Sequence, residues 1–181
     1  MDERDPLLAR RTLLRMAAAA AALGIAVPRA DAAPRRVPAF AALLDWLPGR
    51  YAGADSALEI MPAYAPLTAP NAFYLRESPR DEAEVARAQQ LLAVTEGKRG
   101  RALLRIWRFA DEARWRDAHR APDLFKGLMP GDVLPGPVAE IDWHASEPRL
   151  LARRGSGFAF ELDANAITFR QRYEREGGGL P

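Results

Sequence analysis

The chain has 181 residues, and its 26 basic and 24 acidic side chains nearly balance, which argues against the strongly basic surface of a nucleic-acid binder. It has no cysteine, which excludes disulfides, thiolate metal sites and cysteine nucleophiles. Its only histidines, His119 and His144, offer almost no material for a histidine metal cluster or a Ser-His-Asp triad.

The first 32 residues have the three parts of a bacterial secretory signal. Arg10 and Arg11 form a twin-arginine start, an alanine-rich run covers residues 16–27, and small residues at 30–32 suit a signal peptidase. The apolar run is too short to span about 30 Å of hydrocarbon at about 1.5 Å per residue. We expect a twin-arginine signal peptide at 1–32 and a periplasmic mature protein without a stable membrane span. The main alternative is the same segment left uncut.

Cleavage after Ala32 would remove five basic and four acidic residues and leave 21 and 20. The 149 residues that follow are enough for one domain with a proper core. We place a linker rich in proline and arginine at 33–39, one domain at 40–176 and a disordered tail at 177–181.

A short helix is expected to open the domain. The apolar residues that recur at the spacing of one helix face are Phe40, Leu43, Leu44 and Leu47. Pro48 and Gly49 end this run. Residues 54–70, which include three prolines, are interpreted as a loop. A strand is expected at 72–77, while residues 85–96 fit both a helix and a strand, with composition favouring the helix.

Residues 102–110 alternate in the manner of a strand, and 97–100 before them suits a hairpin loop. One face of this strand carries Leu104, Ile106 and Arg108, and the other carries Leu103, Arg105, Trp107 and Phe109. A short charged helix is expected at 111–119, with Trp115 entering the core, and a loop at 122–136.

The last third has the close spacing of an antiparallel meander. Its short runs of strand-forming residues are 138–143, 149–153, 157–162 and 166–173. A leading helix followed by many short strands predicts a mainly β protein, either a barrel or a sandwich.

Six short motifs are informative when they are taken together in their order along the chain. They are Leu44–Tyr51, Phe73–Glu77, Leu104–Asp111, Val133–Gly136, Phe160–Leu162 and Phe169–Tyr173. In this order they resemble the CpcT/CpeT family of bilin chromophore lyases. The resemblance implies an antiparallel, lipocalin-like β-barrel, or calyx, with a leading helix and short rim helices. It also implies that residues 85–96 form a strand.

Members of that family hold a linear tetrapyrrole and deliver it to a cysteine thiol of a partner protein, so the resemblance implies a bilin ligand and an acceptor protein. We expect no cofactor apart from a possible bilin or other small-molecule ligand. The family's step would be positioning of the bilin rather than covalent chemistry by the protein. A homodimer is left open as an assembly.

The resemblance, combined with charge and aromaticity, indicates six residues in or near the calyx. These expected ligand-binding residues are Glu77, Arg105, Trp107, Glu161, Arg170 and Tyr173. Each also has a structural reading, as a solvated charge or a partly exposed aromatic side chain. Arg76 and Glu77 remain alternatives for the family's acidic position, and a shift of one residue turns the side chain to the other face of the barrel. The catalytic residues, if there are any, are not identifiable.

Three functions remain open. The first is a lyase-like chaperone for a bilin, the second is a non-catalytic periplasmic calyx for a small apolar or amphipathic ligand, and the third is a structural exported domain with a filled barrel. The export signal favours the second. So does Ala88-Gln89-Gln90, which stands where relatives often carry Arg-Gln-Arg.

Overall fold

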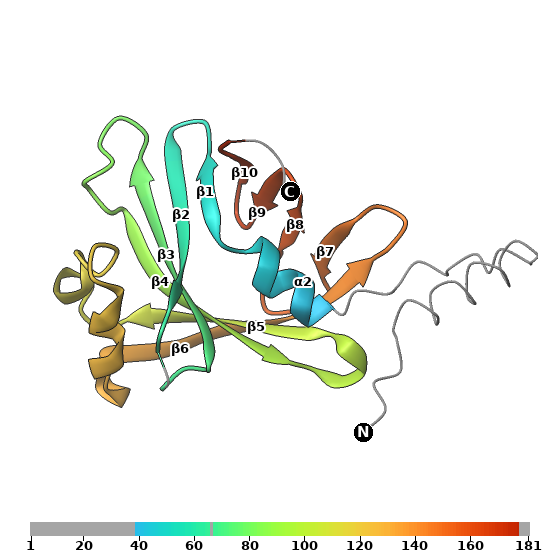
Figure 1. Cartoon of the computed structure of the whole chain (residues 1–181), viewed down its shortest axis with the longest axis horizontal. Coiled ribbons are helices and arrows are strands. Elements are labelled where there is room, and N and C mark those ends of the chain that lie inside the picture. The colour runs from blue at the N-terminus through green and yellow to red at the C-terminus, as the bar shows by residue number, and fades with distance from the viewer. Residues whose placement is uncertain (1–38, 66, 178–181) are drawn as a thin grey trace, which may run out of the picture. The chain divides into compact units, whose positions relative to one another are not determined.

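The computed structural model describes residues 39–65 and 67–177, and within these residues ten antiparallel strands close into a barrel behind one short α-helix (Figure 1). The elements are α2 Ala39–Trp46, β1 Gly49–Ala52, β2 Ser56–Ala63, β3 Asn71–Pro79, β4 Ala88–Glu96, β5 Ala102–Phe109, β6 Val133–His144, β7 Arg149–Ala152, β8 Glu161–Asp163, β9 Ala166–Thr168 and β10 Arg172–Arg175. The prediction of a mainly β barrel with a leading helix is confirmed. The expected signal peptide, residues 33–38 of the linker and residues 178–181 of the tail lie outside the described residues.

Each strand pairs with its neighbour in sequence, so the barrel is built from successive antiparallel pairs. The ring closes where β1 pairs with β10 as well as with β2. That closing pair is short and joins Tyr51 to Arg175 and Ala52 to Glu174. The longest pairings lie between β2 and β6, which make up the continuous half of the sheet.

Alternate residues of the strands point inward and form the main core. Its larger apolar members on the strands are Leu58, Ile60, Phe73, Leu75, Leu92, Val94, Leu104, Ile141, Leu150, Leu162 and Ile167. Helix α2 adds Leu43 to the same core, Leu47 directly after the helix also belongs to it, and α2 contacts β4, β5, β6 and β7. The residues at i, i+3 and i+4 therefore form the face by which the helix packs on the barrel interior.

Arg175 joins the last strand to the end of α2. Its guanidinium donates hydrogen bonds to the carbonyl oxygens of Pro48, at 3.0 Å, and Trp46, and to the Tyr51 hydroxyl at 2.6 Å. It also lies over the Tyr51 ring, 4.7 Å from the centroid. Gly49 makes this approach possible, because it has φ +154° and a Cβ there would lie 2.5 Å from Arg175 Nη1. The carbonyls at the end of the helix are thus satisfied by a side chain of β10.

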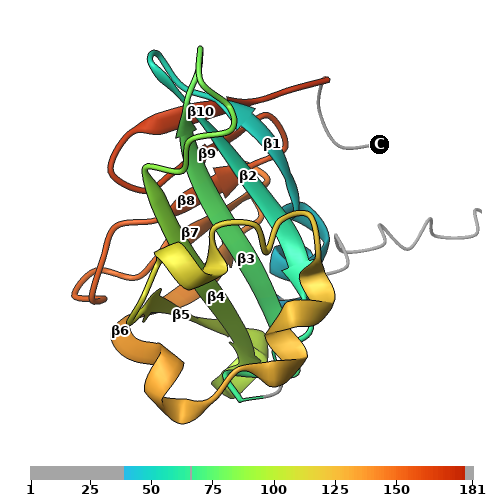
Figure 2. The same ribbon diagram turned by 90° about the vertical axis from the view of Figure 1, so that its left-hand side faces the viewer.

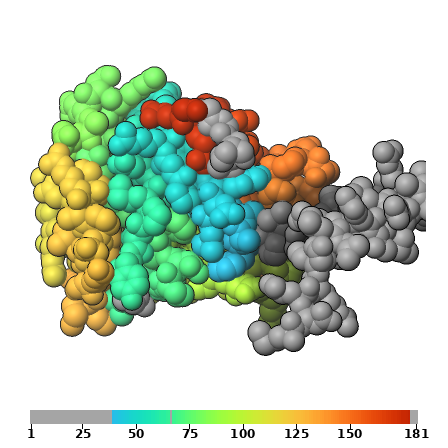
Figure 3. All heavy atoms as spheres, viewed as in Figure 1, coloured from blue at the N-terminus to red at the C-terminus, as the bar shows by residue number. Residues whose placement is uncertain are grey.

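A second core lies outside the barrel, under the segment 111–132. This segment contains the 3₁₀ turns η2 Ala113–Trp115, η3 Pro122–Gly127 and η4 Pro130–Asp132, and it crosses the outer face of β3 and β4 (Figure 2). Trp115, Phe109 and Phe125 form a cluster of three rings, with centroid distances of 5.4 Å from Trp115 to Phe109, 5.6 Å from Trp115 to Phe125 and 6.2 Å between the two phenylalanines. In the space-filling view the same segment, coloured yellow to orange, forms the edge of the molecule beside the green strands (Figure 3). The prediction that Trp115 enters a core is confirmed.

Four expectations about single elements are wrong. Residues 54–70 are not a loop throughout, because β2 covers 56–63, with Leu58 and Ile60 buried on alternate positions despite the nearby prolines. The loop expected at 122–136 ends earlier, because β6 begins at Val133. The strand expected at 157–162 is reduced to β8. The run 166–173 divides into β9 and part of β10. Residues 85–96 contain strand β4, as the resemblance implies.

No helix within 39–65 and 67–177 has both the length and the apolar character needed to cross a membrane.

Candidate functional site

A cavity of about 630 Å³ opens at the end of the barrel where β4 begins and β5 ends. Its lining comes from eight places along the chain: β2, β3, β4, β5, the start of β6, the segment before β8, the segment between β9 and β10, and β10 itself. The lining residues are Leu58, Leu75, Glu77, Ala88, Gln90, Ile106, Arg108, Gly136, Pro137, Phe158, Ala159, Phe169, Arg170 and Tyr173. The volume lies within the range of about 300–1,000 Å³ that is usual for sites of small molecules.

One part of the lining is apolar. Leu58 and Leu75 come from the inner face of neighbouring strands, and Ile106 lies on the inner face of β5. Two aromatic rings complete this part, with Phe158 and Phe169 stacked at a centroid distance of 6.4 Å. The apolar part continues directly into the main core, because these side chains pack against it.

The other part of the lining is polar, and strand register decides its members. Glu77 pairs with Leu58 on one side and Ala88 on the other, so it shares their inward face. Gln90 pairs with Arg108 in the same way. Arg170 and Tyr173 reach the cavity from the segment after β9 and from β10.

Tyr173 lies at the centre of a hydrogen-bond network in the cavity wall. Its hydroxyl donates to Glu77 Oε1 at 3.1 Å and accepts from Gln171 Nε2 at 2.8 Å. Gln171 Nε2 also lies 2.8 Å from the Oγ of Ser56, which is fully buried. Burial raises the pKa of Tyr173, the negative charge of Glu77 adds to the increase, and the hydrogen bonds from Ser56 and Gln171 oppose it. The phenol is therefore protonated at neutral pH and orients Glu77.

A β-bulge shapes the wall formed by β5 and β6. The register between these strands shifts between Arg105 and Trp107. Gly136 lies at this shift, where an added Cβ would be 2.7 Å from the carbonyl oxygen of Ile106. Only glycine allows this close approach of the two backbones. The Val133–Gly136 motif, expected within a loop, is in fact the start of β6 at the mouth of the cavity.

The two cavity arginines are exposed, and neither makes an ion pair within the described part of the chain. Arg108 ends the inner face of β5, and Arg170 lies between β9 and β10. On the outer surface, by contrast, Arg101 and Arg153 both bind Glu140, each at 2.7 Å. The guanidinium groups at the mouth are thus available to a ligand.

The structure brings together three of the six residues expected at the ligand site, namely Glu77, Arg170 and Tyr173. It does not bring Arg105 or Trp107 to the cavity, because the inner face of β5 is the face of Leu104 and Ile106.

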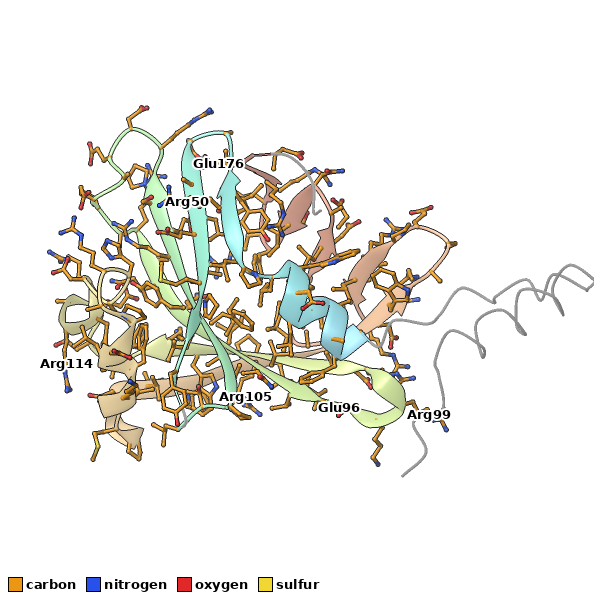
Figure 4. All side chains as sticks on the ribbon, in the orientation of Figure 1. Arg50, Glu96, Arg99, Arg105, Arg114 and Glu176 are labelled. Carbon is orange, nitrogen blue, oxygen red and sulfur yellow. The ribbon has the colours of Figure 1, made fainter. Side chains whose placement is uncertain are left out.

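Arg105 and Trp107 form an outward pair, with the Arg105 guanidinium 5.7 Å from the centre of the Trp107 ring. Figure 4 shows Arg105 below the ribbon of β5. Glu161 also lies away from the cavity, where its Oε1 binds Arg149 at 3.0 Å.

Sequence reasoning missed Gln90 and Arg108 as cavity residues. The signal for Arg108 was present, because it shares a strand face with Leu104, which is fully buried in the main core. Between the two alternatives for the acidic position, Glu77 is the inward one. Arg76 points outward and is 6% exposed, with its Nε and Nη2 lacking hydrogen-bond partners among the described residues.

No cluster of three or more histidine, aspartate or glutamate side chains suited to a metal ion occurs within 39–65 and 67–177. The arrangement at the mouth offers two cations, one oriented carboxylate and one amide beside an apolar chamber. Groups of this kind bind and orient an amphipathic molecule. Neither a protein-family model nor a curated protein matches the chain.

Proposed function

We propose that this protein is a non-catalytic binding protein that holds one small amphipathic molecule in its calyx. The observation that carries the proposal is the open cavity of about 630 Å³, which is apolar on the side of the core and polar at its mouth. A filled barrel, which is the structural alternative, would have no such chamber. An interior of this kind suits a ligand with an apolar body and a polar end.

The polar residues support binding more than catalysis. The Glu77 carboxylate is held by the Tyr173 hydroxyl, and Tyr173 is held in turn by Gln171. The arginines at the mouth have no base or nucleophile paired with them among the described residues. Such a constellation fixes the orientation of a ligand without supplying an acid–base pair for chemistry.

A neutral fluorophore that brightens in apolar surroundings, N-phenyl-1-naphthylamine, tests the proposal. We expect saturable binding of one molecule per chain with a blue-shifted emission. Ala88→Trp places an indole in the cavity and should abolish this binding. Ala113→Trp, on the exposed outer segment, is the matched control and should bind like the original chain.

Ala159→Trp, at the exposed edge of the cavity, is a second blocking variant in case Ala88→Trp does not fold. Both blocking variants are checked for a native circular dichroism spectrum before titration. Unchanged binding in a folded blocking variant, or the absence of binding in the original chain, would overturn the proposal.

A second candidate function is that of a lyase for linear tetrapyrroles, as the CpcT/CpeT resemblance implies. Arg108 and Arg170 at one mouth favour it, since two guanidinium groups suit the two propionates of a bilin. Incubation with biliverdin should then give a shifted visible absorption band. Transfer to the thiol of an acceptor protein would distinguish the lyase from a simple binding protein, and binding without transfer would support the calyx alone.

We also propose that the protein acts in the periplasm, on the basis of the twin arginine at Arg10-Arg11 and the short apolar run after it. Cell fractionation tests this. The full chain should be recovered in the periplasm in a shortened form, and Arg10→Lys with Arg11→Lys should retain it in the cytoplasm. Equal distribution of the two chains would contradict export by this route.

A further inference from the structure

The charged side chains of the cavity do not cancel one another. Among the described residues that line it, the charged ones are Glu77, Arg108 and Arg170, so the lining carries one net positive charge. The single carboxylate already accepts a hydrogen bond from Tyr173. Both guanidinium groups lack an ion pair in the described part of the chain, which leaves the positive charge at the mouth uncompensated.

The exposure of the lining residues gives the cavity a direction. Arg108 and Arg170 are exposed, whereas Leu58 and Leu75 are buried at 3% and 5% exposure. A ligand that enters therefore meets the two cations first and the apolar wall afterwards. An anionic group at one end of the ligand would remain at the mouth while the apolar body displaces water from the wall.

Arg108 and Arg170 reach the mouth of the cavity from distant parts of the chain. Arg108 is the inward residue near the end of β5 and is paired with Gln90, whose amide adds a hydrogen-bond donor on that side. Arg170 comes from the connection between β9 and β10. Guanidinium groups present planar forks of donors that match carboxylate and phosphate oxygens, so this pair is suited to an oxyanion.

We propose that the calyx selects single-tailed anionic amphiphiles, with Arg108 and Arg170 binding the anionic group and the Leu58, Leu75, Ile106 and Phe169 wall binding the tail. This inference rests on the proposed function as a binding calyx. It adds the charge and the orientation of the ligand.

Competition against the neutral fluorophore tests the inference with four ligands that share a twelve-carbon tail, all used below their critical micelle concentrations. These ligands are dodecanoate, dodecyl phosphate, dodecanol and dodecyltrimethylammonium. We expect both anions to displace the fluorophore at concentrations at least tenfold lower than the alcohol, and the cation to be the weakest. The comparison of the two anions shows whether carboxylate or phosphate is preferred.

Arg108→Gln and Arg170→Gln should each weaken dodecanoate about tenfold, which corresponds to about 1.4 kcal/mol. Both should weaken dodecanol and the fluorophore much less, by under about threefold. Retained binding of the fluorophore also shows that the variants are folded. Arg99→Gln is the control, because Arg99 is exposed in the hairpin between β4 and β5, remote from the mouth (Figure 4). It should change none of the affinities.

The outcomes separate the two proposals. If the fluorophore does not bind to the original chain, the proposed function falls, and this inference falls with it. If fluorophore and dodecanol bind but dodecanoate gains no advantage, or keeps its advantage in both glutamine variants, only the inference is overturned. Selection of the anions that is lost in the glutamine variants supports it.

Discussion

At the α2 side of the barrel, Arg175 has acceptors in Trp46, Pro48 and Tyr51, whereas at the open mouth Arg108 and Arg170 extend to solvent without an ion pair in the described chain. Arginine side chains thus serve two different purposes in this barrel. On the α2 side it fixes the last strand to the helix and contributes to stability. At the mouth its donors remain free, and their contribution depends on a ligand.

Substitutions should therefore separate into two groups. Changes on the α2 side should reduce the free energy of unfolding, and changes at the mouth should reduce binding with little loss of stability. Four measurements, taken from the largest expected effect to the smallest, test the α2 side and the outer layer against this division.

Leu43→Ala should have the largest effect, because Leu43 is fully buried where α2 packs on the barrel core. Removing such a side chain leaves a cavity and costs about 2–5 kcal/mol. Urea unfolding followed by circular dichroism measures the change. Leu134→Ala, with Leu134 48% exposed near the mouth, is the matched control and should change stability by less than about 0.5 kcal/mol. Similar losses in both variants would remove the distinction between the two sides.

Arg175→Met should lower the unfolding free energy by about 2–3 kcal/mol, because it leaves the carbonyls of Trp46 and Pro48 and the Tyr51 hydroxyl without this charged donor. Arg172→Met, three residues earlier, removes an exposed arginine whose partners are Glu174 and Asp163 and should cost less than about 1 kcal/mol. The same urea experiment compares them. Equal stabilities of the two variants would show that Arg175 does not fix β10 to the helix.

Stability should fall in alkaline solution. Burial raises the pKa of Tyr51 to about 12, from an ordinary value of 10.0, although the neighbouring Arg175 opposes the increase. The folded chain then keeps a proton that the unfolded chain releases, so the stabilisation is complete below pH 10 and declines toward pH 12, by up to about 1.4 kcal/mol per pH unit.

Unfolding free energies measured between pH 9 and 12 test this decline, with Tyr51→Phe as the comparison. In this variant the unfolding free energy should fall less steeply with pH, because the contribution of the Tyr51 proton is gone. Tyr74 and Tyr173, whose pKa values burial also raises, should still contribute to the decline. An unchanged slope in Tyr51→Phe would assign the alkaline loss to other groups.

Arg76→Met should have the smallest effect, within about 1 kcal/mol and in either direction. Arg76 is buried on the outer face of β3, and two of its nitrogens have no partner among the described residues. Replacing a poorly compensated buried charge by an apolar side chain is often neutral or stabilising. Thermal unfolding compares the variant with the original chain. A loss above 3 kcal/mol would show that this guanidinium has strong partners, as Arg175 has.

The local elements were predictable where one period dominates the sequence. The spacing of Leu43, Leu44 and Leu47 predicted α2, and the alternation in residues 102–110 predicted β5. Alternation shows which residues share a face but not which face is inside. For this reason Arg105 was expected at the cavity and Arg108 was not, although Leu104 and Arg108 lie on one face.

Other features depend on contacts between distant residues, which local patterns do not contain. The segment 111–132 covers the sheet because Phe125 packs on Tyr74 of β3 and Trp115 on Phe109 of β5, and nothing in its charged sequence indicated those packing partners. Closure of the barrel depends on the pairing of Tyr51 with Arg175. The fold class came from element order together with the family resemblance, and the three site residues that share the cavity came from the resemblance together with charge and aromaticity.

Localising the bound fluorophore by NMR tests the central claim most directly. Amide chemical-shift changes on addition of N-phenyl-1-naphthylamine should be concentrated at the mouth, around Gln90, Ile106 and Phe169. Amides of α2 and of the segment 111–132 should remain unchanged. Changes confined to α2 or to the outer segment would contradict the account, because the ligand would then bind outside the calyx.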